Sequence, residues 1–128
     1  MKTYINIAKL FKTKNKMVLR RVHLKKLQPT DFSEDSLPFL LSLSTNQIRE
    51  LNKEDFPQVW ETEDGDYISD GNTRLAVMAL RGVKYAEVDY NSIDDRYNQM
   101  VDDWETREQG QLMRQQGIKT LYDFWRVA

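Results

Sequence analysis

The sequence predicts one α+β domain in which a few short strands are interrupted by helices, with a helical segment at the C-terminal end. Three observations lead to this fold class. Residues 18–27 alternate between two faces, as a strand does, and residues 67–76 indicate a strand that turns directly into a helix. From Ser92 onward, apolar residues recur every three or four positions, which is typical of amphipathic helices.

The composition is that of a globular protein. A chain of 128 residues that is 40% hydrophobic and 30% charged can bury a core as a single domain. It has no apolar run long enough to span a membrane, and residues 1–16 do not resemble a secretory signal, so we expect no membrane location. The absence of cysteine excludes disulfides, thiolate metal sites and cysteine nucleophiles, and makes the cytoplasm the simplest compartment.

The first half of the chain predicts one strand and two helices. The strand covers Val18–Leu27 and leads into a turn at Pro29–Asp31. A helix should begin at Ser33, ahead of a leucine-rich stretch, and a second short helix should be capped by Ser44 or Thr45.

The middle of the chain predicts a hairpin, a buried helix and a further strand. Gln58–Thr62 and Asp66–Ser69 flank Asp64-Gly65, a strong hairpin signal. The helix after the Gly71 turn is apolar nearly all round, so it should be largely buried, and Gly82 suits the left-handed position at its end. A strand over Tyr85–Tyr90 should follow.

The predicted domain therefore has three parts. A basic arm covers residues 1–17, the core covers 18–90, and a helical extension covers 91–128 with a last short helix over Leu121–Trp125. Four aromatic residues of the extension lie at helical spacing and favour core or dimer contacts over base stacking: Trp104, Tyr122, Phe124 and Trp125.

The net charge of −1 conceals an asymmetry. Residues 1–26 carry nine Lys or Arg and no acid, whereas the rest of the chain has ten bases against twenty acids. The basic segment could contact nucleic acid, remain a solvated tail, or fold against the acidic part of its own chain or of a second copy in a homodimer. The candidate nucleic-acid contacts are Lys12, Lys14, Lys16, Arg20 and Arg21.

The turn from strand to helix at Gly71 is the most specific candidate site. The N-terminal end of a helix attracts anions, and phosphate above all, through its unpaired backbone N–H groups and its dipole. We expect Gly71, Asn72, Thr73 and Arg74 to contact a phosphate group. The alternatives are that Gly71 only supplies a special backbone conformation, that Thr73 bonds a backbone carbonyl, and that Arg74 pairs with Asp70 or another internal acid. For Asp70, the role of a helix cap is favoured over that of a catalytic base.

The remaining chemical candidates favour structural interpretations. His23 has no second ligand nearby in the sequence, so packing or surface exposure is expected. Two acidic clusters could hold Mg²⁺ beside a nucleotide, but solvated surfaces are the expected outcome, and no metal site is predicted. These clusters are Glu61, Glu63, Asp64 and Asp66, and Asp94, Asp95, Asp102 and Asp103.

The order of elements over Val18–Tyr90 resembles the ParB/sulfiredoxin superfamily, the ParB-like nuclease-domain family. The resemblance lies in an opening strand that ends in a proline-containing turn, RRVHLKKLQPTD, and in a strand that leads through D-G-x-x-R into a buried helix, SDGNTRLAVMALRG. It implies a small mixed sheet with surrounding helices. It also implies a nucleotide, such as a nucleoside triphosphate with Mg²⁺, at the D-G-x-x-R corner.

Departures from the family pattern narrow the function. Asn72 stands where sulfiredoxin has its catalytic cysteine, which excludes sulfinic acid reduction. Arg74 is a single arginine where partition proteins have a pair, Thr73 replaces a frequent histidine, and no helix-turn-helix domain follows. We therefore expect a protein that binds a nucleotide or another phosphorylated ligand, with no catalytic residue assigned. The alternatives are a nucleic-acid-binding or nuclease protein and a non-catalytic interaction module.

Overall fold

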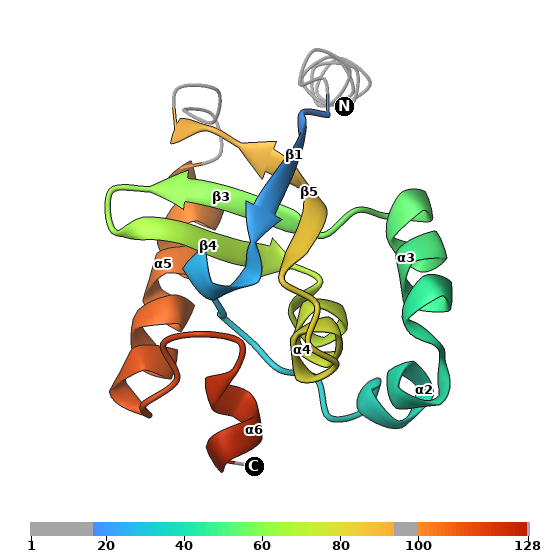
Figure 1. Ribbon diagram of the computed structural model, residues 1–128. Coiled ribbons are helices and arrows are strands. Elements are labelled where there is room, and N and C mark those ends of the chain that lie inside the picture. The colour runs from blue at the N-terminus through green and yellow to red at the C-terminus, as the bar shows by residue number, and fades with distance from the viewer. Residues whose placement is uncertain (1–16, 94–99, 128) are drawn as a thin grey trace, which may run out of the picture.

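The computed structural model describes residues 17–93 and 100–127, and it has a mixed α+β architecture (Figure 1). This part of the chain contains an open, five-stranded mixed sheet and five α-helices. The strands are β1 (Leu19–His23), β2 (Leu27–Gln28), β3 (Gln58–Thr62), β4 (Gly65–Asp70) and β5 (Tyr85–Asn91). The helices are η1, a 3₁₀ turn (Leu24–Lys26), α2 (Leu37–Ser42), α3 (Thr45–Glu54), α4 (Asn72–Leu80), α5 (Met100–Gln115) and α6 (Asp123–Val127).

The strands of the sheet lie in the order β1-β5-β3-β4-β2. The β1–β5 and β3–β4 pairs are antiparallel, and the β3–β5 and β2–β4 pairs are parallel. Although β1 and β2 follow each other in the chain, they occupy opposite edges of the sheet. The three residues of η1 are all that separate them, and the His23–Leu27 segment can span at most about 14 Å. Because the edges of a flat five-stranded sheet would lie about 19 Å apart, this sheet must curl.

The prediction of one continuous strand over Val18–Leu27 was therefore wrong. The chain leaves the strand at Leu24, whose backbone N–H donates to the carbonyl of Lys84. His23 Nδ1 then accepts a hydrogen bond from the backbone N–H of Lys25 and caps the 3₁₀ turn. In the structure Leu24 and Leu27 are both buried and Lys25 and Lys26 are both exposed, so the alternation expected of a strand ends at this turn.

Helix α4 packs at the centre of the structure and is largely buried, as predicted. Five consecutive apolar residues, Leu75 to Ala79, are each at most 3% exposed. The helices α2 and α3 lie on one side of α4 and α6 on the other (Figure 1). Gly82 ends α4 in the left-handed conformation, where its N–H bonds the carbonyl of Ala79 and the N–H of Val83 bonds that of Met78. This is a Schellman motif, and it confirms the predicted role of Gly82.

The predicted helices differ from the observed ones mainly in their ends. Ser44 forms a capping box with Gln47 at the start of α3, as expected of the Ser44/Thr45 pair. Helix α2 begins at Leu37 rather than Ser33, with a turn over residues 34–36 ahead of it. A helix that began at Ser33 would place Pro38 beyond the first turn, where its missing N–H and its ring are unfavourable. The last helix covers Asp123–Val127 rather than Leu121–Trp125.

The C-terminal helices pack against the core in two places. Helix α5 lies against β3 and β4, where Gly110 approaches the ring of Tyr67 so closely that a Cβ atom would lie 2.3 Å from it. Phe124 is buried, and Trp125 donates from its indole N–H to the carbonyl of Ala76. Trp104 is 63% exposed, so within the described chain it is not a core residue, and for Trp104 the dimer contact stays a prediction.

Replacing Gly71 with alanine should destabilise the protein by about 1–3 kcal/mol. Gly71 has a φ of +89°, and a Cβ atom here would lie 2.8 Å from Cβ of Pro57. Gly117→Ala is a matched control, because Gly117 has a φ of +86° but no neighbour within 4 Å of the added Cβ atom. Urea unfolding should show a larger loss for Gly71→Ala than for Gly117→Ala. Equal losses would mean that the Pro57 contact is easily relieved.

Candidate functional site

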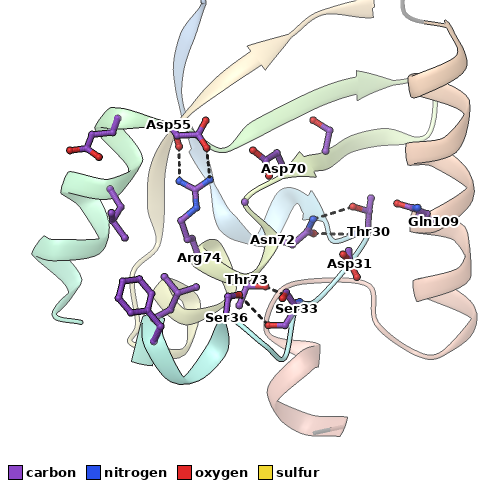
Figure 2. Close-up of a pocket in the computed structure, with 16 residues that line it drawn as sticks. Thr30, Asp31, Ser33, Ser36, Asp55, Asp70, Asn72, Thr73, Arg74 and Gln109 are labelled. Atoms are coloured by element: carbon purple, nitrogen blue, oxygen red, sulfur yellow. Dashed lines mark hydrogen bonds and ion pairs between the residues drawn. The ribbon is translucent and has the colours of Figure 1, made fainter. Parts of the chain in front are cut away.

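A cavity of about 530 Å³ opens at the corner where β4 turns into α4 (Figure 2). We call it the corner cavity. The loop after β2, the helices α2 and α3, the β4–α4 turn and Gln109 of α5 form its wall. Its polar and charged lining residues are Thr30, Asp31, Ser33, Ser36, Glu54, Asp55, Ser69, Asp70, Asn72, Thr73, Arg74 and Gln109. The structure therefore brings all five residues of the predicted corner, Asp70 to Arg74, to one cavity.

The first turn of α4 has no side-chain cap in the described chain. Gly71 is the N-cap residue, with a left-handed backbone, and it has no side chain to offer the following N–H groups. Asp70 precedes the cap position, and no side-chain hydrogen bond to the helix start is formed, so its interpretation as the helix cap was wrong. The positive end of the α4 dipole consequently lies in the wall of the cavity.

Asn72 and Thr73 hold the loop after β2 against α4. The Asn72 carboxamide accepts a hydrogen bond from the Thr30 N–H at 2.9 Å and donates to Thr30 Oγ1 at 3.1 Å. Thr30 Oγ1 in turn donates to the carbonyl of Ile68, and Thr73 Oγ1 accepts from the Ser33 N–H at 2.9 Å. Both side chains are 7% exposed. The alternative of a bond from Thr73 to a backbone carbonyl was therefore wrong in its partner, because the Thr73 hydroxyl oxygen accepts from the backbone N–H of Ser33.

Arg74 points away from the start of its own helix and towards the end of α3, as Figure 2 shows. Its guanidinium donates to Asn52 Oδ1 at 3.0 Å and to the carbonyl of Asp55 at 2.5 Å, and it lies 3.8 Å from Asp55 Oδ2. The side chain is 14% exposed. A cation is favourable at the C-terminal end of a helix, where unpaired carbonyls carry partial negative charge. The structure therefore shows the internal pairing that the sequence left open, with Asp55 as the acid.

Acidic residues dominate the charge of the corner cavity. Four carboxylates line it, and among the described residues the only base in its lining is the Arg74 that already pairs with Asp55. The carboxylates belong to Asp31, Glu54, Asp55 and Asp70. Sequence reasoning did not assign Asp31, Glu54 or Asp55 to the site. The adjacent Pro29–Asp31 turn was recognised, but nothing local indicated that it lies beside residues about forty positions away.

The other predicted residues lie elsewhere. Arg20 lies over the ring of Tyr90, with Cζ 3.9 Å from the ring centroid, and Arg21 lies over Tyr85 at 4.5 Å. Lys12, Lys14 and Lys16 fall outside the described residues. His23 packs edge-on against Tyr85 with ring centroids 4.8 Å apart, in addition to capping the 3₁₀ turn, and it lies outside the corner cavity.

Three of the four acids of the first acidic cluster make internal contacts, and the fourth, Glu63, is exposed. Tyr90 donates its hydroxyl to Asp66 at 2.8 Å and lies 3.4 Å from Glu61, and Asp64 forms an ion pair with Arg107 at 3.1 Å. In residues 17–93 and 100–127, no group of three or more acids and histidines is arranged to hold a metal ion. Asp94 and Asp95 of the second cluster lie outside the described residues, as do the side chains of Asp102 and Asp103.

Replacing Arg74 with methionine should lower the free energy of unfolding by on the order of 2 kcal/mol, since hydrogen bonds to a charged group are lost and the end of α3 keeps unpaired acceptors. Arg74→Lys should recover only part of this, because an ammonium cannot reproduce the guanidinium fork. Chemical unfolding measures both. Arg49→Met, on the exposed surface of α3, is the control and should change the value by less than about 0.5 kcal/mol. If Arg74→Met left the free energy of unfolding unchanged, that result would contradict the role assigned to Arg74.

The phenol of Tyr90 predicts a loss of stability at alkaline pH. Burial, and then the hydrogen bond and charge of Asp66, raise the pKa of Tyr90 above its ordinary value. The folded state holds the Tyr90 proton more tightly than the unfolded state does, so the protonated hydroxyl stabilises the folded state. This stabilisation is complete below the unfolded pKa of about 10 and is lost as pH rises above it. The difference in unfolding free energy between wild type and Tyr90→Phe should therefore shrink from pH 9 towards pH 11. Parallel profiles would show that folding does not raise the pKa of Tyr90.

The comparisons with known proteins identify no relative of this chain. None of the helices in the described ranges is long and apolar enough to cross a membrane. No protein-family model, no curated protein and no solved structure matches the chain. The ParB/sulfiredoxin resemblance therefore stays a prediction from the order of elements and the D-G-x-x-R corner, and the function has to be proposed from the site itself.

Proposed function

We propose that this protein binds a nucleotide or another phosphorylated small molecule in the corner cavity. The observation that carries the proposal is the first turn of α4, which no side chain of residues 17–93 and 100–127 caps and which lines a cavity of about 530 Å³. Backbone N–H groups at such a turn bind phosphate oxygens, and the helix dipole favours their negative charge. The cavity volume falls within the range of small-molecule sites.

The side chains of the D-G-x-x-R corner support the ligand indirectly in this proposal. Asn72 and Thr73 fix the loop that carries Thr30 and Asp31, and Arg74 fixes the end of α3. These contacts set the shape of the wall around the α4 turn. In this proposal the backbone N–H groups from Gly71 to Arg74 bind the phosphate. Their arrangement requires only the glycine turn and the start of a helix.

The carboxylates of the cavity favour a ligand that brings a divalent cation. A free phosphate would meet four carboxylates and one paired arginine, whereas a Mg²⁺–nucleotide complex neutralises part of its own charge. Mg²⁺ is commonly held by one or two carboxylates together with substrate phosphates, so no preformed three-acid site is required. Asp31 and Asp70 are the proposed carboxylates, as both line the cavity beside the α4 turn.

The proposal extends to binding and does not assign a reaction. A cytoplasmic location is proposed from the lack of cysteine in the sequence. Nucleic-acid contact through residues 1–26 and a homodimer or interaction module remain the competing predictions. Of the five basic candidates, only Arg20 and Arg21 lie in the described chain, and both stack on tyrosines near one edge of the sheet.

Thermal-shift measurements and calorimetry with ATP, CTP, GTP and ADP, each with and without Mg²⁺, test the proposal. We expect at least one of them to raise the melting temperature in the presence of Mg²⁺ and to move the amide NMR signals of residues 71–74. Asp31→Asn and Asp70→Asn should each weaken the Mg²⁺-dependent binding by about tenfold, which corresponds to about 1.4 kcal/mol.

The control is Glu63→Gln, an exposed carboxylate in the β3–β4 turn outside the cavity, which should bind as wild type does. If neutralising Asp31 or Asp70 strengthens binding, the ligand enters as a free anion and the Mg²⁺ part of the proposal is wrong. If no ligand moves the signals of residues 71–74, the corner is not a phosphate site.

A further inference from the structure

A second cavity, of about 480 Å³, lies on the other side of the α3 helix from the corner cavity. We call it the basic cavity. Residues of β1, α3, α4 and β5 and of the segment after α3 line it: Arg21, Arg49, Asn52, Lys53, Phe56, Met78, Tyr85, Ala86 and Glu87. None of these residues lines the corner cavity, so the two are separate spaces in the described chain.

The charge of the basic cavity is opposite to that of the corner cavity. Three bases, Arg21, Arg49 and Lys53, line it against the single carboxylate of Glu87. Cationic side chains gathered around a concave space raise the local concentration of anions and select against cations. A phosphate or other polyanion is the ligand class that this lining fits.

The cations on α3 are available to a ligand. Arg49 donates to Asn46 at 3.2 Å, and Lys53 pairs with Glu50 at 3.1 Å, each within one turn of the same helix. The Lys53 and Glu50 side chains are 67% and 70% exposed. Pairs of this kind contribute little in water, so an incoming phosphate can replace them at small cost.

Aromatic rings give the basic cavity a second kind of surface. Phe56 and Tyr85 both line it, and Tyr85 is 46% exposed. The Arg21 guanidinium lies over the Tyr85 ring and His23 packs against it edge-on, so contacts within the sheet hold this ring in place. A fixed aromatic ring beside arginines is a surface on which a nucleobase stacks, whatever its sequence.

We propose that the basic cavity is a second binding site, for a nucleoside phosphate, with the phosphate at Arg49 and Lys53 and the base against Tyr85. The nucleoside phosphate is either a free nucleotide or one residue of a single strand. This proposal does not depend on the corner cavity. It also gives Arg21, a predicted nucleic-acid contact, a defined place in a site.

Ligand binding to the two cavities can be tested separately because the cavities have no lining residue in common. Asn52 lines the basic cavity and accepts a hydrogen bond from Arg74, which lines the corner cavity. Amide NMR signals of Arg49, Lys53 and Tyr85 report the basic cavity, and those of residues 71–74 report the corner cavity. The probes are AMP without Mg²⁺, fluorescein-labelled ten-residue oligo(dT), and pyrophosphate.

We expect AMP or the oligonucleotide to move the signals of the basic cavity, with an affinity that falls as salt rises. The double variant Arg49→Gln/Lys53→Gln should raise the dissociation constant about tenfold or more. Tyr85→Ala should raise it about five- to a hundredfold, whereas Tyr85→Phe, which keeps the ring, should restore binding. Lys26→Gln/Lys119→Gln, which changes two exposed bases outside both cavities, removes the same charge and should bind as wild type does.

Each outcome decides the proposal. Binding of AMP assigns a free nucleotide, and binding of the oligonucleotide alone assigns a single strand as the source. Pyrophosphate that binds as tightly as AMP or the oligonucleotide would overturn the nucleoside class, since the ring would then not be recognised. Unmoved signals at Arg49, Lys53 and Tyr85 with all three probes would overturn the site, whatever happens at residues 71–74.

Discussion

The contacts of Arg74 with the end of α3 are the interaction on which both cavities depend. Its guanidinium joins the first turn of α4 to Asn52 and to the carbonyl and carboxylate of Asp55. Helix α3 is thereby held at a fixed distance from α4, with Leu51, Glu54 and Asp55 facing one cavity and Arg49, Asn52 and Lys53 facing the other. A cation that the dipole of its own helix disfavours becomes favourable because it lies at the negative end of another.

A second constraint comes from the short 3₁₀ turn between β1 and β2. Because only Leu24–Lys26 connect strands at opposite edges, the sheet must curl. Strand β2 runs parallel to β4 and ends at Gln28 beside Tyr67, so the chain continues in the direction of the end of β4. The loop after β2 therefore arrives next to the start of α4, where Thr30 meets Asn72 and Ser33 meets Thr73. The corner cavity exists because this loop, which is distant in sequence, closes one of its sides.

What the sequence predicted correctly rests on short-range signals. The Ser44 cap of α3, the β3–β4 hairpin and the left-handed Gly82 each involve residues within a few positions of one another. The predictions that failed or stayed open depend on partners far away in the chain. Arg74 finds Asp55 nineteen residues earlier, and Asn72 finds Thr30 forty-two residues earlier, so no local pattern could identify either partner. The break at Leu24 was hidden for the same reason, since its backbone partner is Lys84.

This dependence changes what the D-G-x-x-R corner means for function. Its side chains indicated ligand contacts because they are polar and stand at a helix start, yet the structure uses Asn72, Thr73 and Arg74 to bind other parts of the protein. Side-chain identity at such a corner thus reports first on how neighbouring elements are held. Ligand recognition then depends on groups that the motif does not contain: the backbone of the first turn and the carboxylates of Asp31 and Asp70. A protein can keep this corner and change its ligand by changing the loop and the helix that the corner holds.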